Sequence, residues 1–124
     1  MPIDLIRLME RCGKRKHDPK TLIRSMRDCL FMAGIYDEAT LVAYGRVCGD
    51  GAMYFLICDF LVDPKYNETN LDMKIYKEID DYLLTVVPND GRVIALTDKK
   101  YERVFRAFGY QYMDRDYRTA MIRE

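Results

Sequence analysis

The turn between a predicted strand and a predicted helix, residues 62–76, is the segment of this sequence best suited to bind a ligand. It reads VDPKYNETNLDMKIY. Such turns often bind phosphate, because the first N–H groups of a helix have no partner within the helix and the helix dipole attracts anions. Phosphate-binding turns are usually rich in glycine, which lets the backbone approach the anion closely. This turn has no glycine, and Glu68, Asn70 and Asp72 occupy the positions where glycine would help most.

Two side chains of the turn are predicted to cap the helix. Thr69 and Asp72 have the T-x-x-D spacing of a capping box at the predicted helix start. A negative charge there also interacts favourably with the helix dipole, by roughly 0.3–1 kcal/mol. A phosphate would need the same N–H groups and would be repelled by Glu68 and Asp72, so the turn is predicted to be capped internally. Three nearby lysines could offset part of this repulsion or simply be solvated: Lys65, Lys74 and Lys77.

The length and composition are those of a soluble globular protein with one domain, residues 1–124. Hydrophobic residues make up 49% of the 124 residues and charged residues 32%. Twenty Lys and Arg residues balance twenty Asp and Glu residues. We therefore expect no electrostatic attraction to nucleic acid or to an anionic membrane. No apolar run approaches the length of a membrane-spanning helix.

The four cysteines have spacings that match no zinc or C-x-x-C pattern: Cys12, Cys29, Cys48 and Cys58. His17 is the only histidine, so no metal site is expected. The N-terminal MPIDLIRLMERC alternates charged and apolar residues, which is not typical of a signal peptide. These observations favour reduced, mostly buried thiols in a cytoplasmic protein.

Two helices are predicted at the N-terminus. The segment PIDLIRLMERC places apolar residues at helical spacing: Ile3, Leu5, Ile6 and Met9. In the second helix, Asp18 is the predicted N-cap and Pro19 the first helical residue. Its predicted buried stripe consists of Leu22, Ile23 and Met26.

The rest of the chain alternates predicted strands and helices. CLFMAGIY and TLVAYGRVCG form a predicted hairpin, AMYFLICDFLVD a central strand, and Leu71 to Val86 the longest helix. RVIALT is a short strand, and DKKYERVFRAFG a helix closed by Gly109. YQYMDRDYRTAMIRE reads as two strands around a DRD turn. The predicted order is α-α-β-β-β-α-β-α-β-β.

Three segments in this order are similar to motifs of the GNAT superfamily of N-acetyltransferases. LVAYGRVCGDG resembles its strand-and-turn segment LVGFGRV, CDFLVDPKY resembles its fourth strand, and VFRAFGY resembles its closing F-Y-x-K-x-G-F element. The resemblance covers most of residues 28–115 and omits the superfamily's usual first strand. It implies an α/β fold with a mixed, mainly antiparallel sheet and helices on both faces. It also implies acetyl-CoA as the cofactor and an amine of a small molecule or peptide as the acceptor.

The resemblance also implies a coenzyme site with altered residues. In that superfamily the turn after the fourth strand carries [R/Q]-x-x-G-x-[G/A] and binds the coenzyme A pyrophosphate. Asn67 takes the Arg/Gln position here, and Glu68, Asn70 and Asp72 take those of the glycines. The implied coenzyme-binding residues of turn and helix are Asn67, Glu68, Thr69, Asn70, Leu71, Asp72 and Met73. Backbone N–H groups of the strand would polarise the acetyl carbonyl: those of Phe60, Leu61 and Val62.

Three catalytic positions follow from the same resemblance. Phe105 falls where the superfamily commonly has a tyrosine that protonates the leaving thiolate, and phenylalanine cannot donate a proton. Tyr101, four residues earlier, could replace it or could be a buried packing residue. Asp59 could accept the proton of the substrate amine or could be a structural, hydrogen-bonded carboxylate.

Two functions therefore remain open. The first is an acetyl-CoA-dependent N-acetyltransferase with weakened coenzyme binding. The second is a catalytically degenerate domain that serves as a binding or protein-interaction module. A nucleic-acid binder fits less well, because no basic stripe accompanies the ten tyrosines. Because the usual first strand is missing, the strand CLFMAGIY has an uncovered edge that is prone to pair. We expect a homodimer, joined at this edge or elsewhere; an N-terminal helix that covers the edge is the alternative.

Overall fold

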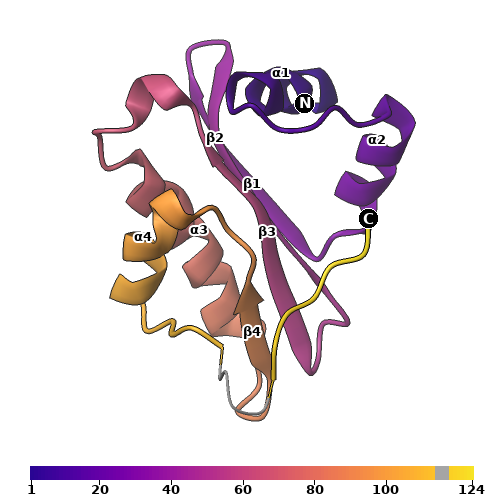
Figure 1. Cartoon of the computed structure of the whole chain (residues 1–124), viewed down its shortest axis with the longest axis vertical. Coiled ribbons are helices and arrows are strands. Elements are labelled where there is room, and N and C mark those ends of the chain that lie inside the picture. Colours follow the sequence, from indigo (N-terminus) through magenta and orange to yellow (C-terminus); the bar gives the residue numbers. More distant parts are fainter. Residues whose placement is uncertain (114–117) are drawn as a thin grey trace.

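The computed structural model describes residues 1–113 and 118–124, which build a four-stranded sheet (Figure 1). The strand order is β1-β2-β3-β4. The first three strands pair antiparallel, and β4 pairs parallel to β3. The predicted mixed, mainly antiparallel sheet is therefore confirmed. The strand bounds are β1 Phe31–Asp37, β2 Thr40–Gly49, β3 Tyr54–Val62 and β4 Arg92–Ala95.

Helices cover both faces of the sheet, as predicted (Figure 1). The α1–α2 face carries α1 (Pro2–Arg11) and α2 (Pro19–Asp28). The α3–α4 face carries α3 (Leu71–Val86) and α4 (Glu102–Ala107). Two short 3-10 turns, η1 (Pro64–Tyr66) and η2 (Lys99–Tyr101), precede α3 and α4. Among the described residues, no helix is long and apolar enough to cross a membrane.

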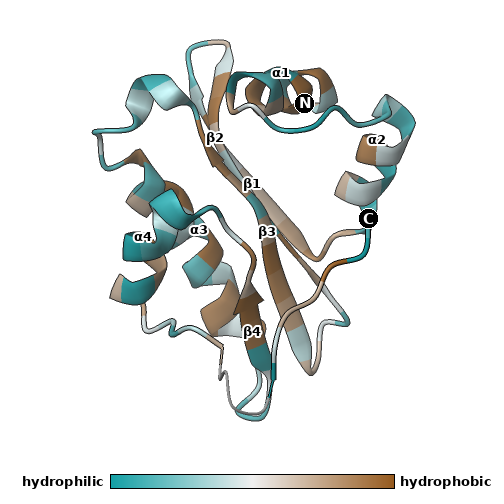
Figure 2. Cartoon of the chain, viewed as in Figure 1, coloured by the Kyte–Doolittle hydropathy of each residue, from teal (hydrophilic) through white to brown (hydrophobic). Residues whose placement is uncertain are grey.

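The strands divide the core into one cluster on each face. Figure 2 shows most of β3 and of β4 as hydrophobic ribbon, whereas the helices alternate between hydrophobic and hydrophilic residues. Phe55 and Ile57 of β3 pack on the α3–α4 face, and so do Phe60 and Val62. The residues on this face thus change from odd-numbered to even-numbered positions along β3. Side chains of a regular strand alternate between faces, so this change requires one extra residue in the strand. Asp59 is at this bulge and has a φ of 53°.

Local sequence signals place most elements correctly. The helix α3 has the predicted bounds, and its predicted stripe is buried: Leu71, Ile75, Ile79 and Leu83. The Asp18 side chain accepts a hydrogen bond from the Lys20 N–H, as expected of an N-cap. Gly109 closes α4 with a φ of 92°, a backbone angle that glycine adopts without strain.

Two predicted core residues of the N-terminal helices are wrong. Ile3 and Ile23 are 56% and 47% exposed. Leu22 and Met26 are four residues apart and share the buried side of α2, whereas Ile23 falls about 100° around the helix from Leu22. In α1 the buried stripe is Leu5, Leu8 and Met9, which leaves Ile3 on the outer side.

The two predicted C-terminal strands are not formed. Residues 110–113 and 118–124 contain no strand, and the predicted DRD turn at 114–116 lies outside the described residues. An alternating pattern favours a strand only where the strand finds a partner and a surface to pack on. Met121 and Ile122 are 90% and 84% exposed, so this segment buries little apolar area. The far edge of β4 consequently has no paired strand in the described part of the chain.

Candidate functional site

An opening between β3 and the segment after β4 contains the strand residues implied by the resemblance. The ladder between these strands runs from Tyr54 and Arg92 to Ile57 and Ala95. The Leu96 N–H still donates to the Ile57 carbonyl, at 3.0 Å. Beyond that point β3 continues to Val62 beside β2 alone. We call the opening between Phe60–Val62 and the following η2 turn the splay.

Tyr101 lies inside the splay. Its side-chain oxygen accepts a hydrogen bond from the Val62 N–H at 2.9 Å. Its ring packs edge-on against Phe60 at 5.0 Å between centroids, and the residue is 4% exposed. The Tyr101 proton faces one acceptor within reach among the described residues, the Val62 carbonyl at 3.5 Å. The splay therefore holds a hydroxyl whose proton is only weakly bonded.

Burial makes this hydroxyl harder to ionise. Desolvation raises the pKa of Tyr101 to about 12, and the hydrogen bond with the Val62 backbone opposes this shift. At neutral pH the group is therefore a proton donor and not a phenolate. Its surroundings fit both sequence-based interpretations of Tyr101, because a buried packing residue here also presents a hydroxyl to the splay.

Phe105 is a packing residue. It is 3% exposed, and its ring makes edge contacts with Phe60, Tyr76 and Tyr110 at centroid distances of 5.1, 5.1 and 5.2 Å. Its position on α4 therefore contributes an apolar wall behind Phe60. It offers no proton to the splay.

A cavity of about 360 Å³ extends from the splay to the beginning of α3. Five of its lining residues were predicted site residues: Val62, Asn67, Glu68, Asp72 and Tyr101. Tyr66, Lys100 and Arg103 complete the lining. We call this space the loop cavity. Among the cavities of the described residues, it is lined by predicted site residues from the strand β3, from the turn before α3 and by Tyr101.

The other implied coenzyme-binding residues do not line the loop cavity with their side chains. Phe60 belongs to the core of the α3–α4 face, and Leu61 to that of the α1–α2 face. Leu71 is buried under the first turn of α3. The side chains of Thr69, Asn70 and Met73 are exposed beside the cavity. These residues could contribute only backbone groups or outer contacts.

Side chains do cap α3, but not with the predicted pairing. The Asp72 carboxylate accepts from the Met73 N–H at 2.8 Å, and the Thr69 hydroxyl oxygen accepts from the Leu71 N–H at 3.3 Å. The Thr69 N–H donates to the Tyr66 carbonyl, so it is not free to complete a capping box. The capping-box prediction is wrong because the η1 turn already uses that N–H. Its consequence still holds, since Asp72 occupies an N–H that a phosphate would need.

The turn does not need glycine for its own conformation. Among the described residues, the non-glycine positions with positive φ are Glu38 and Asp59, both outside the turn. Glu68, Asn70 and Asp72 therefore adopt ordinary backbone angles. Compared with a glycine-rich turn, this turn leaves less room for a phosphate and adds negative charge, because the carboxylates of Glu68 and Asp72 line the loop cavity.

Two cations that sequence reasoning missed line the same cavity. Lys100 and Arg103 face the turn from η2 and α4, and an Arg103 Nη2 atom lies 3.6 Å from the Asp72 carboxylate. None of the three lysines suggested from the sequence lines it. The basic run in DKKYER was the available signal, but it lies about thirty residues after the turn. Only the packing of α4 beside α3 brings the two together.

Asp59 lies apart from Tyr101. Its carboxylate is 2.7 Å from the Nε atom of Arg46, on the α1–α2 face of the sheet. Burial alone would lower the pKa of Arg46, but the hydrogen bond that Arg46 donates to Asp59, together with the charge of that carboxylate, outweighs burial and raises the pKa. The structure therefore does not bring Asp59 and Tyr101 into one cavity. Asp59 lies on the α1–α2 face of β3, whereas Tyr101 lies on the α3–α4 face.

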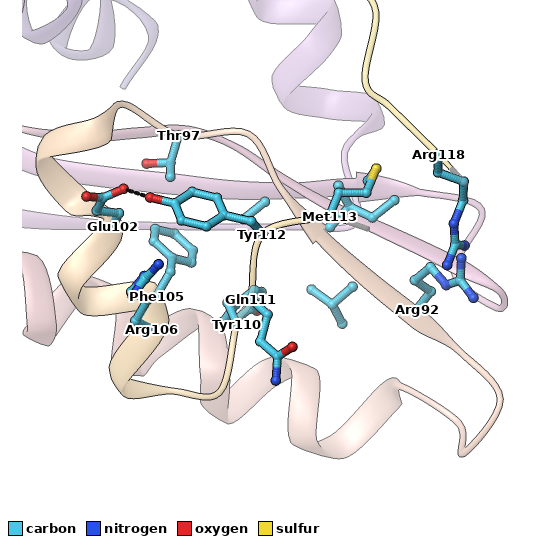
Figure 3. Close-up of a pocket in the computed structure, with 13 residues that line it drawn as sticks. Arg92, Thr97, Glu102, Phe105, Arg106, Tyr110, Gln111, Tyr112, Met113 and Arg118 are labelled. Carbon is cyan, nitrogen blue, oxygen red and sulfur yellow. Dashed lines mark hydrogen bonds between the residues drawn. The ribbon is translucent and has the colours of Figure 1, made fainter. Parts of the chain in front are cut away.

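A further cavity, of about 410 Å³, follows the free edge of β4 (Figure 3). Tyr112 spans it and donates a hydrogen bond to Glu102. Thr97, on its wall, has the one buried side-chain oxygen of the described residues without a hydrogen-bond partner. Among the predicted site residues only Phe105 borders it. This cavity is therefore not the candidate site.

Comparison with known proteins identifies the fold. No family model and no curated protein sequence matches the chain. A Staphylococcus aureus protein of unknown function, a probable acetyltransferase, is 24% identical with a TM-score of 0.89, over 99% of this chain and 92% of that one. A GNAT-family acetyltransferase from Streptococcus pneumoniae is 20% identical with a TM-score of 0.76, over 98% and 89%.

A named enzyme has the same architecture. Glucosamine-6-phosphate N-acetyltransferase from Arabidopsis thaliana is 14% identical, with a TM-score of 0.70, over 100% of this chain and 93% of that one. The chain thus has the fold of GNAT acetyltransferases, and the predicted fold class is confirmed. At these identities the likeness concerns the fold alone.

Proposed function

We propose that this chain is an acetyl-CoA-dependent N-acetyltransferase with weakened coenzyme binding. The observation that carries the proposal is the Tyr101 hydroxyl, held in the splay by the Val62 N–H at 2.9 Å and joined by the loop cavity to the start of α3. When bound, acetyl-CoA supplies a thioester whose acetyl group is transferred to a neutral amine. Tyr101 holds a proton at Oη that it can donate to a departing thiolate.

The residues around the loop cavity fit a coenzyme, but imperfectly. Lys100 and Arg103 offer positive charge for a pyrophosphate, and the first turn of α3 offers its dipole. Glu68 and Asp72 oppose them with two negative charges, and Asp72 already accepts from the Met73 N–H. Since charges of both signs surround the same cavity, we expect binding that is weak but not lost.

Asp59 is assigned to the acceptor side. One of its oxygens is bonded to Arg46, and the other can accept a proton from an amine directly or through a water. The acceptor would reach β3 from the α1–α2 face, where Asp59 lies. The acceptor class proposed is an amine of a small molecule or peptide.

A turnover assay tests the proposal. The purified protein, given acetyl-CoA and a panel of primary amines, is expected to release free coenzyme thiol at a rate that depends on the amine. The released thiol is measured with a chromogenic disulfide, and the acetylated amine by mass spectrometry. Thiol release that is the same with and without every amine would contradict transfer to an amine.

A second candidate function is a degenerate domain that binds a partner without catalysis. The observation in its favour is the start of α3, where the protein's own carboxylates take the place of a bound anion. Such a domain would bind neither coenzyme A nor acetyl-CoA. Coenzyme binding therefore separates the two candidates.

We also propose that the chain forms a homodimer through the edge of β1. In the described residues β1 is the outer strand of the sheet. Helix α1 packs mainly over β2 and β3, and it contacts β1 where the Tyr36 hydroxyl donates to Asp4. An edge with unpaired N–H and C=O groups favours pairing with another strand. Sedimentation velocity is expected to show dimers in the micromolar range, and fewer dimers for Met32→Lys. Monomers alone throughout that range would contradict this prediction.

A further inference from the structure

A small cavity on the α1–α2 face contains a half-buried charged pair that the proposed reaction does not fully explain. Its volume is about 170 Å³. Arg46 of β2 and Asp59 of β3 form its charged side. The remaining lining comes from α1, α2 and the loop between them: Met9, His17, Thr21, Leu22 and Ser25. We call this space the acceptor cavity.

Hydrogen bonds hold the Arg46–Asp59 pair in place but leave one donor atom and one acceptor atom of the pair without a partner among the described residues. Arg46 donates through Nε to Asp59 at 2.7 Å, and its Nη1 atom is 3.4 Å from the Ser25 carbonyl oxygen and 3.2 Å from the Cys48 sulfur. Within the described chain, Arg46 Nη2 and Asp59 Oδ1 have no hydrogen-bond partner. The pair therefore offers one cationic donor and one anionic acceptor beside the cavity.

The backbone at Asp59 supports a functional reason for this arrangement. The φ of 53° is uncommon for a residue other than glycine, and aspartate adopts it more readily than most; such angles concentrate at functional sites. Without the bulge, alternation would turn the side chain at position 59 toward the α3–α4 core. The bulge therefore places the carboxylate beside Arg46 while Phe60 and Val62 continue along the splay.

We infer that the acceptor is a small amino acid, with its amino group at Asp59 and its carboxylate at Arg46; this inference rests on the proposed acetyltransferase function. Guanidinium groups bind carboxylates through several N–H donors, and carboxylates accept hydrogen bonds from amines. The cavity is smaller than the roughly 300–1,000 Å³ of common ligand sites. A peptide N-terminus has an amine without a neighbouring carboxylate, so it meets only half of the pair. Arg46 is then a specificity-determining residue.

Matched acceptors test the inference. Initial rates of acetyl transfer are compared for glycine with glycinamide and for alanine with alaninamide. The wild-type protein is expected to prefer each amino acid to its amide by at least about tenfold in kcat/KM, since a site built for a charged group rejects the neutral analogue. In Arg46→Gln this preference should fall by about the same factor. Comparing the two proteins cancels the different intrinsic reactivities of the amines.

Arg27→Gln is the matched control, because Arg27 is an exposed arginine of α2 whose partner is Asp28. It should keep the wild-type preference. Arg46→Gln leaves Asp59 unpaired and could fail to fold, so the double variant Arg46→Gln with Asp59→Asn is measured beside it. A melting scan of the wild-type protein with each acceptor at millimolar concentration gives a readout without coenzyme. Glycine and alanine should raise the melting temperature more than their amides.

The outcomes separate the inference from the proposed function. If amides and amino acids are acetylated equally well, the inference is overturned and the acetyltransferase proposal stands. If no amine is acetylated, the acetyltransferase proposal fails. In that case equal melting shifts for acids and amides overturn the inference too, whereas a shift specific to amino acids that Arg46→Gln removes upholds recognition at this cavity.

Discussion

Replacing Tyr101 with phenylalanine is expected to lower kcat for acetyl transfer by about 100-fold, the usual effect of losing a general acid. The substitution removes the hydroxyl that the Val62 N–H holds in the splay and keeps the ring that packs on Phe60. The pyrophosphate contacts proposed for the loop cavity are untouched, so KM for acetyl-CoA should change little. Steady-state kinetics at saturating acceptor measures both constants.

Tyr66→Phe is the matched control for this experiment. Tyr66 also lines the loop cavity, but its hydroxyl donates to Asp37 and lies outside the splay. Removing it should change kcat by less than about threefold. Melting temperatures of both variants check that each is folded. An unchanged kcat in Tyr101→Phe, or equal losses in the two folded variants, would contradict the role assigned to Tyr101.

Replacing Glu68, Asn70 and Asp72 together with glycine is expected to strengthen acetyl-CoA binding and to weaken the fold. Two negative charges leave the loop cavity, and the Met73 N–H becomes available to a phosphate. We expect about a tenfold lower Kd, which corresponds to about 1.4 kcal/mol. Removing these side chains also gives the coenzyme more space at the helix start.

The same variant should lose roughly 2 kcal/mol of unfolding free energy, because a helix cap is lost and glycine adds backbone entropy to the unfolded chain. Asp72 accounts for most of this loss, since Asn70 makes no side-chain cap bond. Thermal unfolding without ligand should therefore show a melting temperature lower by several degrees. Added acetyl-CoA should raise the melting temperature of the triple variant more than that of the wild-type protein.

Local patterns were sufficient to predict most of the fold. In α3 the hydrophobic period, the acidic first turn and the following PNDG agree, and the observed bounds are the predicted ones. The hairpin of β1 and β2 and the central strand β3 are likewise specified within a few residues of sequence. The C-terminal strands were different, because a strand pattern does not say whether a pairing partner is available. Whether this segment forms strands depends on its tertiary contacts and not on its local sequence.

The site depended on contacts between distant segments, which the sequence alone could not locate. The loop cations come from η2 and α4, thirty residues beyond the turn they face. Arg46 and Asp59 meet because a bulge in β3 shifts its register against β2. An extra residue in a strand looks like any other residue in the sequence. The family resemblance indicated positions 59, 101 and 105, but only the packing distinguishes the hydroxyl in the splay from the aromatic wall behind it.

Calorimetric titration of acetyl-CoA into the wild-type and triple-glycine proteins tests most directly whether the loop cavity is a coenzyme site limited by its own carboxylates. We predict binding to both proteins, with a wild-type Kd on the order of 100 μM and about tenfold tighter binding to the glycine variant. No heat from either protein at millimolar acetyl-CoA would contradict the enzyme proposal and favour the interaction module. Tight binding to the wild-type protein with no gain from the glycines would show that Glu68 and Asp72 are not obstacles to the coenzyme.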